Sequence, residues 1–173
     1  MNVSGLLRLH VSTSEREEAD RCAMLRLADE LERPTSREQV RADFTASAFV
    51  VDEGCGRMCL VAHAKLGRLL QPGGHVEPTD LTLEAAALRE AREETGLELE
   101  LHPAAPRPFD LDVHEIPARP GEPAHYHLDV RYLLVGRGAL CEGAEWFELD
   151  HEVEPSVRRM AEKALTYRGP GAG

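Results

Sequence analysis

Positive charge is scarce in this chain. Lysine and arginine total 20 residues against 31 aspartates and glutamates, which leaves a formal net charge of −11, and lysine occurs only at Lys65 and Lys163. An acidic surface repels the phosphate backbone of nucleic acids, so this composition argues against a generic DNA- or RNA-binding protein. A small anionic substrate is compatible with it, provided that a cation neutralises the binding site.

Long apolar stretches are also missing. No segment of the sequence approaches the length of a membrane-spanning helix, and the N-terminus lacks the pattern of a secretory signal peptide. The four cysteines form no CxxC pair, and Cys55 and Cys59 have no matching second pair to complete a zinc site. These absences predict a cytoplasmic protein with free thiols and without a membrane partner.

The 173 residues suffice for one domain with a short extension. Residues 12–33 have a helical pattern, in which Ser14 and Glu17 fit a capping box and Pro34 stops the helix, and a short second helix is expected from Thr35. The expected organisation is a helical extension (1–42) that docks on the domain or builds a homodimer contact, a main domain (43–168) and a flexible tail (169–173).

The main domain contains several strand patterns and one long central helix. Strands are predicted over residues 44–52, 56–64, 97–103, 107–117, 125–136 and 145–149. A C-terminal helix is predicted from Pro155, and the segment that leads to the glycine pair Gly73–Gly74 is predicted to be a loop. The order of elements is therefore mixed α and β.

The central helix, within "LEAAALREAREETGLE", carries three glutamates on one side. At about 100° per residue, Glu90, Glu93 and Glu94 continue the arc that Leu83 and Ala87 use for packing. Partly buried like charges need compensation, and a divalent cation supplies it; hard oxygen ligands favour Mg²⁺ or Mn²⁺. The competing interpretation is a solvated acidic helix end without metal.

The segment "GGHVEPTD…LREAREETGL" resembles the Nudix box, Gly-x5-Glu-x7-Arg-Glu-apolar-x-Glu-Glu-x-Gly-apolar. Gly74 takes the place of the box glycine, and the second half matches at Arg89, Glu90, Ala91, Glu93, Glu94, Gly96 and Leu97. There are two departures. Asp80 replaces the first glutamate, and eight residues rather than seven separate it from Arg89, so the role of Asp80 is left open.

The resemblance implies an α+β fold, a Nudix-like α/β/α sandwich with a mixed central β-sheet. It implies a hydrolase that cleaves the pyrophosphate bond of a nucleoside diphosphate linked to another moiety, by water attack at phosphorus. Glu90, Glu93 and Glu94 would bind the metal together with the backbone carbonyl of Gly73, and Arg89 would orient its neighbouring carboxylates. The substrate would be a small nucleotide-like diphosphate, whose leaving group no motif specifies.

Other candidate site residues lie outside the helix. The general base is open between a box glutamate and a glutamate before the last strand, Glu142 or Glu145. Substrate contacts are expected from residues that precede the glycine pair or share one face of the strand over 125–136: Lys65, Arg68, His127, Asp129 and Arg131. The competing interpretation is solvated loop charges and the wet face of an antiparallel sheet.

Two other functions compete with the hydrolase. A catalytically inactive Nudix-like module that senses a nucleotide would often have lost box acids, whereas all three are present here. A relative of isopentenyl diphosphate isomerase would need a catalytic cysteine, and Cys55 and Cys59 lie in an expected turn and strand without a matching context.

Overall fold

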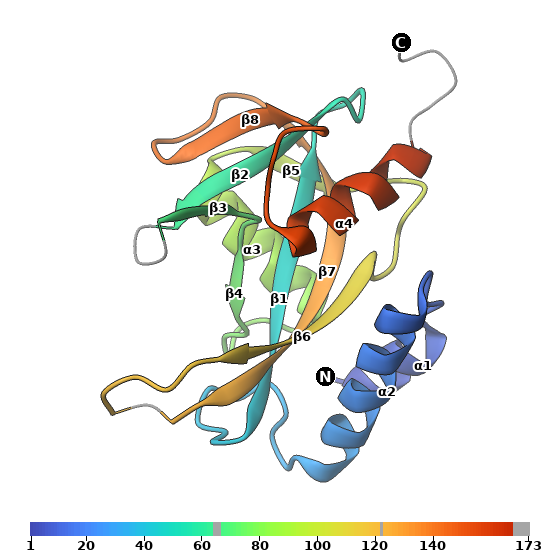
Figure 1. Cartoon of the computed structure of the whole chain (residues 1–173), viewed down its shortest axis with the longest axis vertical. Helices are drawn as coiled ribbons and strands as arrows, with labels where there is room; N and C mark the ends of the chain where they lie inside the picture. Colours follow the sequence, from blue (N-terminus) through green and yellow to red (C-terminus); the bar gives the residue numbers. More distant parts are fainter. Residues whose placement is uncertain (64–66, 122, 168–173) are drawn as a thin grey trace.

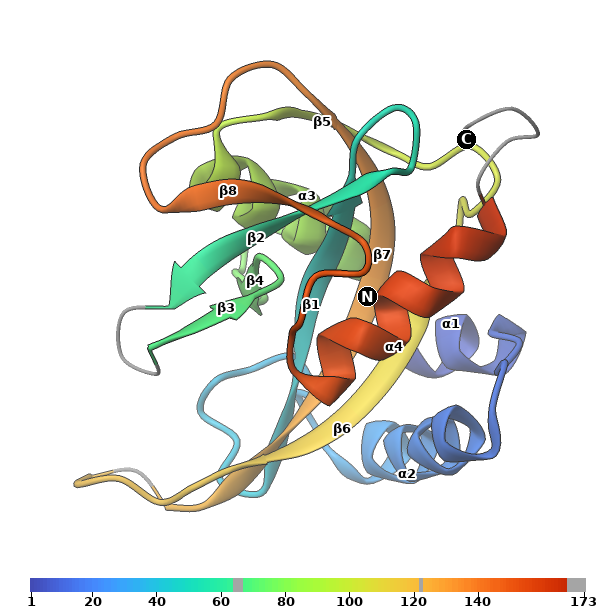
Figure 2. The same cartoon turned by 45° about the horizontal axis from the view of Figure 1, so that its top comes forward.

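The computed structural model describes residues 1–63, 67–121 and 123–167, and Figure 1 shows its arrangement. Helix α3 (Leu83–Thr95) covers one face of a curved sheet, and α4 (Pro155–Ala164) lies over the other face. Figure 2 shows the same layers from a second direction. A mixed sheet with helices on both faces is an α/β/α sandwich, so the predicted α+β fold class is confirmed.

Parallel pairing of β1 with β7 forms the centre of the eight-stranded sheet. The pairing runs without a break from Ala42 opposite Tyr126 to Val51 opposite Val135. The strands are β1 (Ala42–Val51), β2 (Arg57–His63), β3 (Arg68–Leu70), β4 (Gly73–His75), β5 (Glu98–Leu101), β6 (Asp110–Ile116), β7 (His125–Arg137) and β8 (Ala144–Glu148). Strands β5 and β6 both pair antiparallel with β7, while β2 and β4 pair antiparallel with β1.

Every residue of β1 is buried because both faces of this strand are covered. Side chains of a strand point alternately to the two faces, so β1 contributes to two separate cores. Ala46, Ala48 and Val50 belong to the core under α3, whereas Phe49 and Val51 belong to the core under α4. The buried strand β1 thus packs against the helical layers on both faces of the sheet.

Three short features differ from the sequence-based expectations. The predicted helix from Thr35 is wrong: residues 32–41 form turns and bends. Helix α1 (Val3–Leu9), which Asn2 caps by accepting a hydrogen bond from the Gly5 amide at 2.8 Å, was not predicted. The segment before the box, which was predicted to be a loop, contains β3 and β4. These strands were missed because three residues are too few to show a period. The tail 169–173 lies outside the described residues.

Helix α2 (Glu15–Glu30) forms half of the predicted capping box. Ser14 Oγ accepts from the Glu17 amide at 3.2 Å. The Glu17 carboxylate binds Thr13 rather than the Ser14 amide, with 2.7 Å between Oε2 and the Thr13 nitrogen. Oε1 lies 2.7 Å from His10 Nε2 and 3.0 Å from Nζ of Lys163 in α4. A buried carboxylate therefore ties the N-terminal helices to the C-terminal one.

Burial alone would raise the pKa of Glu17, but hydrogen bonds from His10, Thr13 and Lys163 lower it to about 2.

Within the described part of the chain, no helix combines the length and apolar character required to cross a membrane. The four cysteines are free thiols.

We expect Glu17→Gln to destabilise the fold in a pH-dependent way. A carboxylate whose pKa falls from 4.5 to about 2 on folding stabilises fully above about pH 4.5, by roughly 3 kcal/mol, and the gain is lost as the pH falls toward 2. Chemical denaturation at several pH values should show a deficit that is largest near neutrality and shrinks below pH 4.5. The exposed Glu15, changed to glutamine, is the control, and a deficit independent of pH would contradict the assignment.

Candidate active site

The glycine pair brings the loop before α3 against strand β1. Gly73 and Gly74 lie in β4, opposite Ser47 and Ala46 of β1. A Cβ atom on Gly73 would lie 2.3 Å from the Cβ of Ser47, and one on Gly74 would lie 2.7 Å from Cδ of Glu90. A side chain at Gly73 would clash with the backbone of β1, whereas one at Gly74 would meet only the flexible end of Glu90. Gly73 is therefore required for β4 to pack against β1, and Gly74 leaves room for the Glu90 carboxylate.

Arg89 connects this loop to the helix. Its guanidinium donates to Asp80 from Nη2 at 2.8 Å and from Nε at 3.2 Å, and Nη2 also donates to the His75 carbonyl at 3.1 Å. Nη1 lies 2.9 Å from Glu90 Oε1 and 3.5 Å from Glu93 Oε2. One planar cation thereby orients two of the three glutamates and anchors the loop.

Asp80 serves as the main anchor of Arg89. The hydrogen bonds from Arg89 lower the pKa of Asp80, and the aspartate also accepts from the Glu77 amide at 2.8 Å. The extra residue of this box lies before α3, which begins with Thr82 as its N-cap and ends at Gly96 in the left-handed conformation with φ 74°. Asp80 has a shorter side chain than the usual glutamate, but the extra residue in the loop lets its carboxylate reach Arg89.

The three glutamates differ in exposure and partners. The side chain of Glu90 is 18% exposed and that of Glu93 is 61% exposed. Glu94 Oε2 accepts from the Gly73 amide at 3.0 Å. Partial burial raises the pKa of Glu94, and the charges of Glu90 and Glu93 raise it further. Neighbouring carboxylates whose charges act on one another in this way are oxygen ligands of the type that a hard divalent cation such as Mg²⁺ or Mn²⁺ prefers.

A cleft of about 420 Å³ opens beside Glu94. Its lining comes from the box loop, from β1 and from the wall formed by β6 and β7, and includes Glu94, Gly73, Gly74, Thr45, Ser47, His63, His75, His114, Arg119, His125, His127 and Asp129. A larger hollow of about 670 Å³ lies around residues 32–38, but among the described residues that line it there is none of the three glutamates. The smaller cleft is therefore the candidate active site.

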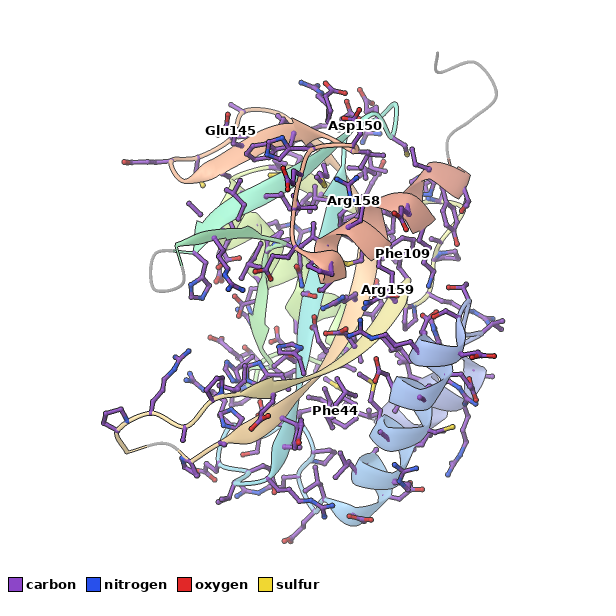
Figure 3. All side chains as sticks on the ribbon, in the orientation of Figure 1. Phe44, Phe109, Glu145, Asp150, Arg158 and Arg159 are labelled. Atoms are coloured by element: carbon purple, nitrogen blue, oxygen red, sulfur yellow. The ribbon has the colours of Figure 1, made fainter. Side chains whose placement is uncertain are left out.

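The structure brings some of the predicted substrate contacts to this cleft and separates others. His127 and Asp129 line it. Arg68 is paired with Glu154 instead. Lys65 lies outside the described residues. Glu142 is exposed and is not among the described residues that line the cleft, and Figure 3 shows Glu145 on β8.

Arg131 lies beneath the cleft wall rather than on its surface. Its side chain is 1% exposed and is enclosed by three aspartates: Nε donates to Asp129 at 2.8 Å, Nη2 to Asp112 at 3.0 Å and Nη1 to Asp110 at 3.2 Å. From α4 (Figure 3), Arg159 donates to two of these aspartates, to Asp112 at 2.7 Å and to Asp110 at 3.2 Å. The Arg131 guanidinium is bound by these carboxylates, and Nη2 also donates to Ser156 Oγ at 3.1 Å, so its role is to hold β6 and β7 together and to connect them to α4.

Sequence reasoning did not single out Thr45 and Ser47. Both hydroxyls donate to Asp129, at 3.2 and 2.8 Å, and both line the cleft. Polar residues at alternate positions of an otherwise apolar strand were the available signal, because they mark one face of "FTASAFVVD".

Comparison with known proteins agrees with this geometry. The model of the NUDIX domain matches residues 42–165. The chain belongs to the Nudix family. The resemblance to the Nudix family is thereby confirmed, and so is the prediction of a hydrolase that acts on pyrophosphate bonds.

Solved structures of Nudix hydrolases have the same fold. A NUDIX-family hydrolase from Clostridium perfringens is 24% identical, with a TM-score of 0.54 over 73% of this chain and 97% of that one. A MutT NUDIX hydrolase from Burkholderia pseudomallei is 26% identical, with a TM-score of 0.51 over 71% and 98%. An Ap4A hydrolase of C. elegans, 16% identical, gives a TM-score of 0.52 over 72% and 96%. No curated protein matches the chain in a sequence search.

We expect Gly74→Ala to weaken Mn²⁺ binding while the protein stays folded. The added Cβ would displace the flexible Glu90 carboxylate, 2.7 Å away, and disturbing the support of a metal ligand lowers affinity by about 10- to 100-fold. Titration with Mn²⁺, followed by electron paramagnetic resonance, measures this. Gly54→Ala is the matched control, because a Cβ there meets nothing within 4 Å. Equal Mn²⁺ affinity in both variants would contradict the placement of Glu90.

Proposed function

We propose that this Nudix hydrolase depends on a divalent metal, Mg²⁺ or Mn²⁺, and cleaves a pyrophosphate bond in a nucleoside diphosphate linked to another moiety, by water attack at phosphorus. The observation that carries the proposal is the way in which neighbouring glutamates of α3 are held: Arg89 binds Glu90 and Glu93, and the Gly73 amide binds Glu94, which lines the polar cleft together with Gly73. The carboxylates, together with the Gly73 carbonyl, would hold the metal. A divalent ion bound there neutralises the diphosphate and lowers the pKa of a bound water.

The protein's own groups keep these oxygens in place. Arg89 restricts the rotamers of Glu90 and Glu93, and the Gly73 amide does the same for Glu94. Asp80 in turn holds Arg89, so the arrangement does not depend on the metal for its shape. Ligands held in place in this way lose less side-chain entropy when the metal ion binds.

For the general base, a box glutamate is a better candidate than Glu142. A base must come within hydrogen-bond reach of the attacking water, and Glu94 lines the cleft whereas Glu142 lies on an exposed loop. The second candidate function, a nucleotide-sensing module without catalysis, would use the same cleft. The intact set of three carboxylates supports the enzyme over the sensor.

The proposed partner is a small nucleotide-like diphosphate rather than a nucleic acid, and the proposed location is the cytoplasm. The net charge of −11 supports the first point because it disfavours long polyanions. We also propose that residues 1–42 are an extension to a main domain over residues 43–168. A homodimer contact through α2 stays a prediction, which light scattering of the purified chain measures.

We expect Glu93→Gln and Glu94→Gln each to lower kcat by at least about 100-fold, the scale of losing one positioned catalytic group. Glutamine keeps the shape and removes the charge, so the fold should persist. Release of nucleoside monophosphate or phosphate in the presence of Mg²⁺ is the measurement. Glu98→Gln, an exposed residue on β5, is the control, and Glu142→Gln tests the alternative base. A fully active Glu94→Gln enzyme would exclude Glu94 as a metal ligand.

A substrate screen should separate the enzyme from the sensor. The compounds are ADP-ribose, dinucleoside polyphosphates, NADH, coenzyme A and nucleoside triphosphates, each with Mg²⁺ and with Mn²⁺, and mass spectrometry identifies the bond that breaks. We expect turnover of at least one compound, cleaved between two phosphorus atoms. Tight binding of a nucleotide without turnover, by the wild-type chain as by Glu93→Gln, would establish the sensor instead.

A further inference from the structure

Four histidines of the candidate cleft, His75, His114, His125 and His127, lie close to one another, and the buried Asp43 lies beside them. His127 is the register partner of Asp43 across the β1–β7 pair and of His114 across the β6–β7 pair. The ring of His127 lies 5.0 Å from that of His75, 5.3 Å from that of His125 and 5.5 Å from that of His114, between centroids. Nε2 of His75 is 3.4 Å from Oδ2 of Asp43.

Three members of this group offer ligand atoms to a common point. One atom each from Asp43, His125 and His127 lie within 4.8 Å of one another. Asp43 is 2% exposed and His125 is 7% exposed, so they are not part of a solvated acidic surface. Their convergence follows from the sheet: His125 and His127 alternate on one face of β7, and the parallel register brings Asp43 beside them.

A backbone contact of His125 determines which of its two ring nitrogens can bind a metal. Nδ1 of His125 lies 3.0 Å from the carbonyl oxygen of Pro123. Since that oxygen can only accept, Nδ1 carries the proton and Nε2 is the nitrogen that can act as a ligand.

We propose that Asp43, His125 and His127 bind a divalent transition-metal ion, with Zn²⁺ as the best match, at a site separate from the box glutamates. Two imidazole nitrogens and one carboxylate are ligands of borderline metals, whereas Mg²⁺ selects oxygen. Three protein ligands leave a coordination position open, as in catalytic zinc sites. Because His125 and His127 line the cleft, that position would take an anionic oxygen of the molecule that occupies it.

The two metal sites would therefore act on one ligand from different walls of the cleft. The box carboxylates lie at the α3 and β4 side, and the histidine site lies on β1 and β7. His75 borders the box loop and also approaches Asp43, so it lies between the two groups. The ligands of this second site are not box glutamates, so Zn²⁺ binding there does not depend on whether the box supports hydrolysis.

The test is Zn²⁺ binding to the full chain by isothermal titration in excess Mg²⁺, which keeps the box site saturated. We expect one Zn²⁺ per chain. We expect the affinity to fall by at least about 100-fold in His127→Ala and Asp43→Asn, since even the loss of a partner that supports a ligand costs 10- to 100-fold. His151→Ala, an exposed histidine that is not among the described residues of the cleft, should bind as the wild type does, and so should Glu93→Gln.

A second measurement does not depend on the variants being folded. Long-range ¹H–¹⁵N correlation spectra of the wild-type histidine rings should show the ligand nitrogens of His125 and His127 shifting when one equivalent of Zn²⁺ is added. Shifts at those two rings support the site. The proposal is overturned by absence of Zn²⁺ binding, by shifts confined to other histidines, or by a Zn²⁺ affinity that falls in Glu93→Gln and not in His127→Ala.

Discussion

The parallel pairing of β1 with β7 is the constraint on which the rest of this structure depends. It joins segments more than eighty positions apart, and the register is continuous, since every residue of β1 has a partner on β7. The register places Asp43, Thr45 and Ser47 beside His127, Asp129 and Arg131 in that order. A shift by one residue would send these polar groups into the opposite core and replace them with apolar ones. The chemistry of the cleft is therefore fixed by the same alignment that builds the two cores.

Charge in this acidic protein is organised around a small number of cations. Arg131 collects three aspartates under the cleft wall, and Arg89 collects an aspartate and two glutamates at the box. Each arginine works inside the fold as a junction between elements distant in sequence. At the glutamates this compensation is incomplete, because one guanidinium faces several carboxylates and Glu94 stays beyond its described contacts. The excess negative charge left there is the physical basis for expecting a metal.

The sequence predicted the parts of the fold that repeat a period. Helix α3, its glycine cap and the long strands were all recognisable, because apolar residues recur at helical or alternating spacing over many positions. Helix α1, β3 and β4 were not, since α1 has only seven residues and the three-residue strands RLL and GGH show no alternation of apolar and polar residues. For the site, the Nudix box gave the glutamates and Arg89. Alternation alone could not distinguish a cleft residue such as His127 from a buried one such as Arg131, because both lie on the same face of β7. Which of them is covered depends on the elements that pack on that face, and a strand pattern does not contain this information.

The contact between Glu17 and Lys163 joins residues 146 positions apart and has a consequence for biosynthesis. During translation, the N-terminal helices leave the ribosome long before α4 is made. Until then Glu17 has only His10 and Thr13 as polar partners among the contacts described, and the surface that α4 covers is open to solvent. The newly made chain thus lacks the lysine partner of this carboxylate until α4 emerges and Lys163 reaches Glu17.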